Sequence, residues 1–90
     1  MAVEVKVPTI LRTHTGGEKA VSGAGGTLGE VLDDVDSRHS GIRDRVVDGE
    51  GLRRFVNVYV NDEDVRFTGG LSTTVADGDT VVILPAVAGG

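Results

Sequence analysis

The amino-acid sequence predicts an α+β domain, in which a mixed β-sheet packs against one main helix. Residues 27–39 repeat their apolar positions at the spacing of a helix, whereas segments near both ends and in the second half alternate apolar and polar residues, as strands do. The 90 residues suffice for one hydrophobic core but not for two. One amphipathic helix and several short strands can bury their apolar faces only against each other, which favours a layered α+β arrangement.

The first two strands are predicted to form a hairpin. Residues 2–7 ("AVEVKV") carry valine at every second position. Pro8 closes this segment, because proline cannot donate a hydrogen bond to a neighbouring strand. Gly16-Gly17 favours a turn, and residues 18–22 ("EKAVS") follow as the second strand.

The main helix starts at a capping signal. Thr27 and Glu30 have the S/T-x-x-E spacing, in which each side chain accepts a hydrogen bond from a free backbone N–H at the start of a helix. Ser40-Gly41 favours the end of the helix. Between these signals, four apolar residues recur on one face of the helix: Leu28, Val31, Leu32 and Val35.

The second half of the chain is predicted to add further strands. Residues 42–54 predict a short helical turn and then a loop broken by glycines. Residues 54–61 ("RFVNVYVN") alternate strongly and form the clearest strand. The "NDED" segment, residues 61–64, predicts a turn, after which residues 65–67 are expected to pair briefly.

The last predicted strand covers residues 80–85 ("TVVILP"), after the turn signal Asp77-Gly78. Its residues are apolar on both faces, which is typical of a strand in the middle of a sheet. We expect it to lie beside residues 2–7, and parallel pairing there gives the β-grasp fold. The chain is thus expected to be a single β-grasp domain over residues 1–90, with residues 86–90 as a flexible Gly-Gly tail.

Composition excludes several classes of function. The absence of cysteine excludes disulfides, iron–sulfur clusters and thiol catalysis. The net charge of −5, with only two Phe and one Tyr, disfavours binding to nucleic acid. The chain start lacks the features of a signal peptide, and no apolar run approaches the ~20 residues that span a bilayer. We therefore expect a cytoplasmic protein that binds neither nucleic acid nor membranes.

Short motifs within the domain do not predict a metal site, a bound cofactor or an active site. The glycine-rich residues 22–30 ("SGAGGTLGE") lack the Gly-Lys-Ser/Thr of a phosphate loop. The carboxylates at residues 61–65 and 77–79 do not follow the pattern of a calcium loop and favour solvated turns. His14 and His39 have no evident third ligand, and no serine stands in a nucleophile elbow.

The segment "PAVAGG", residues 85–90, is the strongest functional feature of the sequence. With 14 glycines in 90 residues, a Gly-Gly end arises by chance in roughly one chain in forty. Small residues can extend through a narrow channel, because glycine permits close backbone approach. Such a tail would deliver the carboxylate of Gly90, which becomes a good electrophile only as a mixed anhydride with AMP. We therefore expect a chemical handle that other enzymes process.

The segments "VNDEDVR" and "DGDTVVILP", together with the Gly-Gly end, make the chain resemble the ubiquitin-like sulfur carriers of the ThiS and MoaD type. The likeness covers essentially the whole chain and is greatest to the actinobacterial carriers of cysteine synthesis. The resemblance implies a carrier that is not itself an enzyme and holds no cofactor.

In this family an E1-like enzyme uses ATP to adenylate the terminal glycine, and a sulfur donor converts the adenylate to a thiocarboxylate. In the cysteine branch, a PLP-dependent synthase adds this sulfur to an aminoacrylate made from O-phosphoserine. A zinc protease of the JAMM type then releases cysteine and restores the carrier. The resemblance implies the same partners for this chain.

The resemblance assigns the adenylate and the sulfur to Gly90 and partner contacts to a set of other residues. For Leu84, Val65 and Phe67 a plain core position is the alternative, and it is favoured for Phe67. Acidic residues 62–64 either steer basic partners or form a solvated turn. The proposed partner contacts are Gly89, Ala88, Val87, Ala86, Leu84, Val65 and Phe67.

Three other functions stay open at this point. The same activated glycine serves a ubiquitin-like protein modifier, which transfers it to lysines of target proteins. A carrier of this shape also serves as a sulfur donor for molybdopterin, thiamine or a secondary metabolite. Finally, a β-grasp binding module with an inert tail needs no activation at all.

Overall fold

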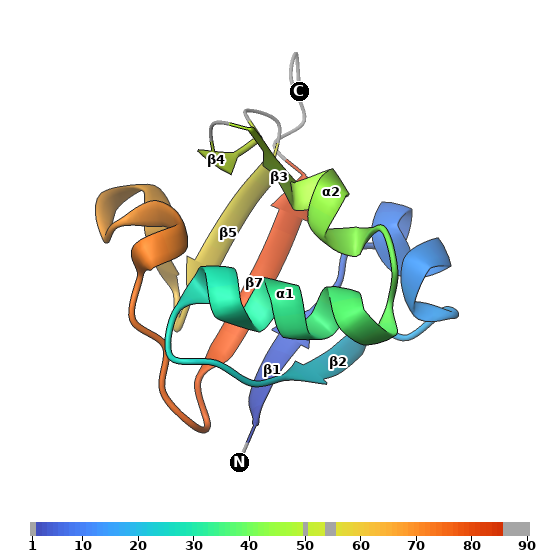
Figure 1. Ribbon diagram of the computed structural model, residues 1–90, viewed down its shortest axis with the longest axis horizontal. Helices are drawn as coiled ribbons and strands as arrows, with labels where there is room; N and C mark the ends of the chain where they lie inside the picture. The colour runs from blue at the N-terminus through green and yellow to red at the C-terminus, as the bar shows by residue number, and fades with distance from the viewer. Residues whose placement is uncertain (1, 50, 54–55, 86–90) are drawn as a thin grey trace.

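The computed structural model describes residues 2–49, 51–53 and 56–85, and it has the β-grasp fold (Figure 1). The strands of its main sheet lie in the order β2-β1-β7-β5-β6. Helix α1 (Leu28–Arg38) crosses one face of this sheet. The strands are β1 (Val3–Lys6), β2 (Ala20–Gly23), β5 (Val56–Val60), β6 (Glu63–Asp64) and β7 (Thr80–Pro85).

Strand β7 lies at the centre of the sheet, as predicted. It pairs with β1 in parallel, with Val5 opposite Val81, and with β5 in the antiparallel direction, with Val58 opposite Ile83. Only one face of β7 is covered, however. Val81 and Ile83 point into the core, whereas Leu84 on the other face is 45% exposed. The apolar character of β7 on both faces therefore reflects burial on one face and an open apolar surface on the other.

The start of α1 is fixed by the predicted capping residues, in a slightly different arrangement. The Thr27 hydroxyl accepts a hydrogen bond from the Glu30 N–H at 3.3 Å. The Glu30 carboxylate accepts from the Gly26 N–H at 2.8 Å, one residue before the position expected of a capping box. The Leu28 N–H donates to the carbonyl of Thr73, so a distant segment satisfies a further free donor of the helix.

Glycines bring the chain before α1 into close contact with the helix. A Cβ at Gly23 would lie 2.8 Å from a methyl group of Val35, and one at Gly25 would lie 2.6 Å from the Cβ of Glu30. Any other residue would push the helix away from strand β2. The glycine-rich segment therefore serves helix packing, which agrees with the rejection of a phosphate loop.

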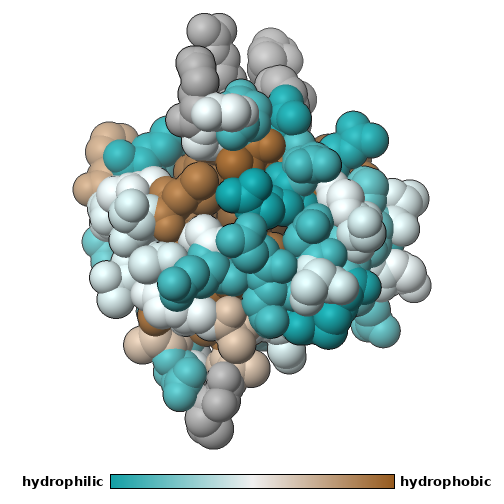
Figure 2. Space-filling model, viewed as in Figure 1, coloured by the Kyte–Doolittle hydropathy of each residue, from teal (hydrophilic) through white to brown (hydrophobic). Residues whose placement is uncertain are grey.

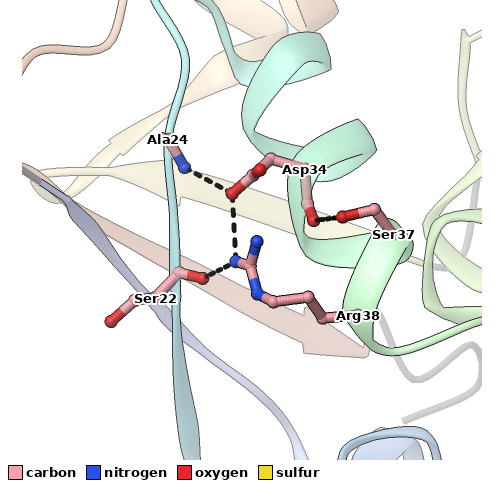
Figure 3. Close-up of polar contacts among 5 residues, drawn as sticks. All are labelled: Ser22, Ala24, Asp34, Ser37 and Arg38. Carbon is pink, nitrogen blue, oxygen red and sulfur yellow. Dashed lines mark hydrogen bonds and ion pairs between the residues drawn. The ribbon is translucent and has the colours of Figure 1, made fainter.

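A small polar cluster ties α1 to strand β2 (Figure 3). The Asp34 carboxylate accepts hydrogen bonds from Arg38 at 3.0 Å and from the Ala24 N–H at 2.9 Å. Arg38 also donates to the carbonyl of Ser22. The Arg38 hydrogen bond, followed by that of Ala24, lowers the pKa of Asp34 below its ordinary value of 3.8.

A seven-residue 3-10 helix, η1 (Thr9–Thr15), separates β1 from β2 and was not predicted. Its residues lack the 3.6-residue apolar spacing, and 3-10 segments of this length are uncommon. Gly16, with φ of 65°, ends it, and the Gly17 N–H donates to the carbonyl of Arg12 at 2.8 Å. The predicted turn at Gly16-Gly17 is thus confirmed.

Residues after α1 form the predicted helical turn and an additional hairpin. Helix α2 (Ile42–Val46) is followed by β3 (Val47–Asp48) and β4 (Gly51–Leu52), which pair with each other in the antiparallel direction. A loop was expected in place of this hairpin. Strands of two residues are too short to show an alternating pattern in the sequence.

The "NDED" turn is confirmed, but the pairing expected after it is wrong. Asn61 and Asp62 have positive φ angles of 49° and 73°, as a two-residue hairpin turn requires, and β6 pairs with β5 directly after them. The segment η2 (Val65–Phe67) is a 3-10 helix instead of a strand. The Asp64 carboxylate accepts from the Arg66 N–H at 2.9 Å and caps it, and a second 3-10 helix, η3 (Gly70–Ser72), follows.

The hydrophobic core lies between the sheet and α1, with α2 and η2 closing its edges. On the face viewed in Figure 2, apolar surface gathers near the β3–β4 hairpin and is surrounded by hydrophilic groups. No helix among the described residues is long and apolar enough to cross a bilayer. The core residues are Val3, Val5, Val7, Leu11, Leu28, Val31, Leu32, Val35, Ile42, Val46, Val47, Val56, Val58, Val60, Val65, Val75, Val81 and Ile83.

Candidate functional site

The base of the tail is held by the central strand of the sheet. Pro85, the last residue of β7, lies opposite Val56 of β5, and Leu84 lies opposite Asn57. Strand β7 is bonded to neighbours on both sides, so the direction in which the chain leaves the sheet is fixed by two ladders. The predicted tail residues lie outside the described part of the structure: Ala86, Val87, Ala88, Gly89 and Gly90.

The segment that follows β1 lies at the same end of the sheet as the base of the tail. Because β1 and β7 are parallel, their carboxyl ends meet at one edge. Pro8 and η1 leave β1 there, and α2 packs against η1 (Figure 1). Elements from the first half of the chain therefore lie at the end of the sheet where β7, the last strand, ends.

The three predicted partner contacts outside the tail have different environments. Leu84 is 45% exposed on the sheet face that α1 does not cover, so its side chain is accessible to a partner. Phe67 is 88% exposed, so the core position favoured for it is wrong. Val65 is fully buried, and its predicted contact with a partner is wrong because its side chain lies in the core under η2.

Arg66 forms hydrogen bonds to strand β5, which pairs with the last residues of β7. The sequence did not predict this role. The Arg66 guanidinium donates to the carbonyls of Val56 at 2.6 Å and Arg53 at 2.9 Å, and to the side-chain oxygen of Asn57 at 2.6 Å. Val56 and Asn57 are the residues opposite Pro85 and Leu84. Arginine can bind several acceptors at once because its donors are fixed in one plane. Only the segment "VNDEDVR", noted for its resemblance, drew attention to this position.

The acidic turn lies at the other end of the sheet. Val60 pairs with Val81 near the start of β7, so Asp62 and Glu63 are separated from Pro85 by most of the length of that strand. Asp79 lies at this end as well. Hydrogen bonds from the Ala76 N–H and from Asn61 lower its pKa below the ordinary value of 3.8. Steering by these carboxylates would act far from the tail.

Metal-ligating side chains do not cluster in the described part of the structure. Within residues 2–49, 51–53 and 56–85, no group of three His, Asp or Glu side chains is placed to hold a metal ion. His14 lies against Gly41, where a Cβ would be 3.1 Å from its Nδ1. The arrangement that the structure does provide is a central strand, bonded on both sides, that ends directly before a short segment of small residues.

Comparison with known proteins identifies the family. The profile of the ThiS family matches residues 5–90. Sulfur carrier protein CysO of Mycobacterium tuberculosis is 61% identical over 93 residues, with 100% of both chains covered. The crystal structure of the Amycolatopsis orientalis BexX/CysO complex contains a chain that is 67% identical, with a TM-score of 0.94 and coverage of 99% of this chain and 100% of that one. Small archaeal modifier protein 3 of Haloferax volcanii is 34% identical over 64 residues, which are 71% of this chain and 70% of that protein. The chain therefore belongs to the ThiS family.

Proposed function

We propose that this chain is a sulfur carrier whose Gly90 accepts sulfur as a thiocarboxylate and donates it for cysteine biosynthesis. The observation that carries the proposal is the 61% identity to a sulfur carrier protein over the full length of both chains. The fold is consistent with it, because β7 is anchored on both sides and ends directly before the tail. The chain contributes a substrate group, and partner enzymes contribute the catalysis.

Activation of the tail requires ATP and a separate enzyme. The Gly90 carboxylate attacks ATP, which gives an acyl adenylate and pyrophosphate. A sulfur nucleophile then displaces AMP, so that one carboxylate oxygen leaves with AMP and sulfur takes its place. Because the chain has no cysteine, the sulfur has no other attachment point on this protein. The E1-like partner supplies the groups that bind ATP.

Delivery of the sulfur requires further partners. In the proposed cycle, the thiocarboxylate sulfur adds to an aminoacrylate held by a PLP-dependent synthase. An S-to-N acyl shift then leaves cysteine linked to Gly90 by an amide bond. Hydrolysis of that bond by a JAMM-type zinc protease releases cysteine and restores the carboxylate. Binding to partner proteins is supported by the complex of a 67% identical relative with BexX.

The intact mass of the protein tests this proposal directly. The chain is incubated with ATP, sulfide and the E1-like enzyme of its host, and its mass is measured before and after alkylation. We expect the mass change of one oxygen replaced by sulfur, located at Gly90, and a further increase by one alkyl group after alkylation, because the thiocarboxylate sulfur is the nucleophile that displaces the leaving group of the reagent. A variant lacking Gly90 and one extended by a single residue are the controls, and both are expected to stay unchanged. An unchanged wild-type mass with an active enzyme overturns the proposal.

A protein modifier is the second candidate, favoured by the 34% identity to a small archaeal modifier protein. It predicts higher-mass conjugates in host lysates that contain this chain linked to lysines of other proteins. This chain itself has only Lys6 and Lys19 as acceptors, which disfavours long polymers. Detection of conjugates that disappear with the Gly90 deletion would support the modifier, whereas sulfur acquisition without conjugates supports the carrier alone.

A further inference from the structure

A groove lies between η1 and α2 at the end of the sheet from which the tail leaves. Its volume is about 320 Å³. The side chains that line it are mostly apolar, and Ile10 at its rim is 68% exposed although it is a large aliphatic residue. The lining residues are Pro8, Ile10, Leu11, His14, Arg45, Val56 and Ile83.

Basic groups extend this groove along α2. A second hollow shares His14 and Arg45 with the groove and adds Arg53 and Asp44. The Arg53 Nε–H donates to the carbonyl of Asp44 at 2.7 Å, which holds the guanidinium against α2. The lining therefore carries two arginines and one aspartate in a chain whose net charge is −5. The net charge of this lining is opposite in sign to the net charge of the protein.

The position of the groove limits what can cover it. Ile83 lines the groove and stands two residues before Pro85, the last described residue. The five residues that follow span at most about 18 Å when fully extended. Any enzyme that acts on Gly90 must therefore approach within about 18 Å of Pro85. A stable protein interface covers about 800 Å² on each partner, more than a tail of five small residues offers.

We propose that this groove is a docking site for the channel rim of the activating enzyme, through an apolar side chain beside a carboxylate. The apolar side chain packs beside the exposed Ile10, over buried lining residues that include Ile83, and the carboxylate faces Arg45 and Arg53. This inference rests on the proposed function, since it assumes an enzyme that takes up the tail. It differs from the predicted contact at Leu84, which lies on the opposite face of β7.

Kinetics of sulfur acquisition by groove variants test the inference. Ile10→Asp and Arg45→Glu change exposed side chains, so the fold is expected to persist, and thermal unfolding checks this. With the activating enzyme, ATP and sulfide, we expect each variant to raise KM by about tenfold while kcat changes by less than about twofold. Ala2→Asp, which adds the same single negative charge as Ile10→Asp at the far end of β1, is the matched control for that variant and should leave KM unchanged. Arg45→Lys should retain most of the affinity.

The outcomes separate this inference from the proposed function. If the wild-type protein gains sulfur and both groove variants have the wild-type KM, the proposed docking site is wrong, whereas the proposed sulfur-carrier function is retained. If the wild-type protein gains no sulfur with an active enzyme, the docking site and the proposed function are both wrong. Two other occupants of the groove also overturn the inference. Amide shifts at Ile10 and His14 on removal of residues 86–90 would identify the tail itself, and a dimer dissociated by Ile10→Asp would identify a second copy.

Discussion

At the scale of single residues, exposure separates structural side chains from those available to a partner. Val65 and Phe67 are two positions apart in η2, yet the first is fully buried and the second is 88% exposed. Both side chains are hydrophobic, and the sequence favoured a core position for Phe67, the one that is exposed. The turn of η2 directs one into the core and the other into solvent.

Truncation of the buried Val65 side chain should lower the stability of the protein much more than truncation of the exposed Phe67 side chain. Val65→Ala removes two buried methyl groups and should lower the free energy of unfolding by about 2 kcal/mol, without a direct effect on partner affinity. Phe67→Ala should change stability by less than about 0.5 kcal/mol. Urea unfolding and binding to the activating enzyme measure both effects. Equal losses of stability in the two variants would contradict the burial described here.

At the scale of elements, glycines decide how closely α1 approaches β2. Gly25 lies against the backbone at the start of the helix, where a Cβ would be 2.9 Å from the carbonyl carbon of Glu30. A neighbouring glycine, Gly26, has no such contact, because its nearest atom would be the Glu30 Oε1 at 3.5 Å. Close packing therefore requires glycine at position 25 but not at position 26.

Alanine substitutions at Gly25 and Gly26 should change the free energy of unfolding in different directions. Gly25→Ala forces the start of α1 away from β2 and should cost about 2 kcal/mol of unfolding free energy. Gly26→Ala restricts the unfolded chain without a clash and should be neutral or stabilise by up to about 1 kcal/mol. Chemical denaturation of the two variants under the same conditions gives the comparison. A destabilised Gly26→Ala beside an unaffected Gly25→Ala would show that the helix packs differently.

At the scale of the whole molecule, two aspartates in different parts of the fold each accept a hydrogen bond from a backbone N–H of a nearby segment. Asp34 accepts from Ala24 and holds α1 to the segment after β2, whereas Asp79 accepts from Ala76 at 2.8 Å in the turn before β7. Both carboxyl groups have pKa values below 3.8 in the folded protein. The folded state therefore binds protons less readily than the unfolded state at these two sites.

Stability should consequently fall in acid. A lowered folded pKa contributes stability that is fully present above the ordinary value of 3.8 and is lost as the pH falls through the folded pKa. Urea unfolding between pH 6 and about pH 2.5 should show this loss, and Asp34→Asn and Asp79→Asn should each make the decline shallower. Asp62→Asn in the exposed hairpin turn controls for the change in net charge. Parallel curves for all three variants would show that these hydrogen bonds do not link folding to pH.

The sequence by itself determined the layers of the fold and the family resemblance. The capped helix at Thr27, the alternating strands and the doubly apolar β7 each depend on neighbours within a few residues, and their periods are visible in the chain. The likeness of "DGDTVVILP" and the Gly-Gly end to sulfur carriers likewise needs no coordinates. Short elements such as η1 and the β3–β4 hairpin were missed, because they are too brief or too irregular to carry a period.

Only the tertiary structure decided which elements lie beside the end of β7. Parallel pairing of β1 with β7 places η1, from the first sixth of the chain, beside the last strand. The contact of α2 with η1 brings Ile10 and Arg45 to one groove. The antiparallel pairing of β5 with β7 places the acidic turn at Asp62 at the other end of the sheet. Burial of Val65 and exposure of Phe67 depend equally on the path of the chain through space. These properties arise from contacts between residues far apart in sequence, which local patterns do not encode.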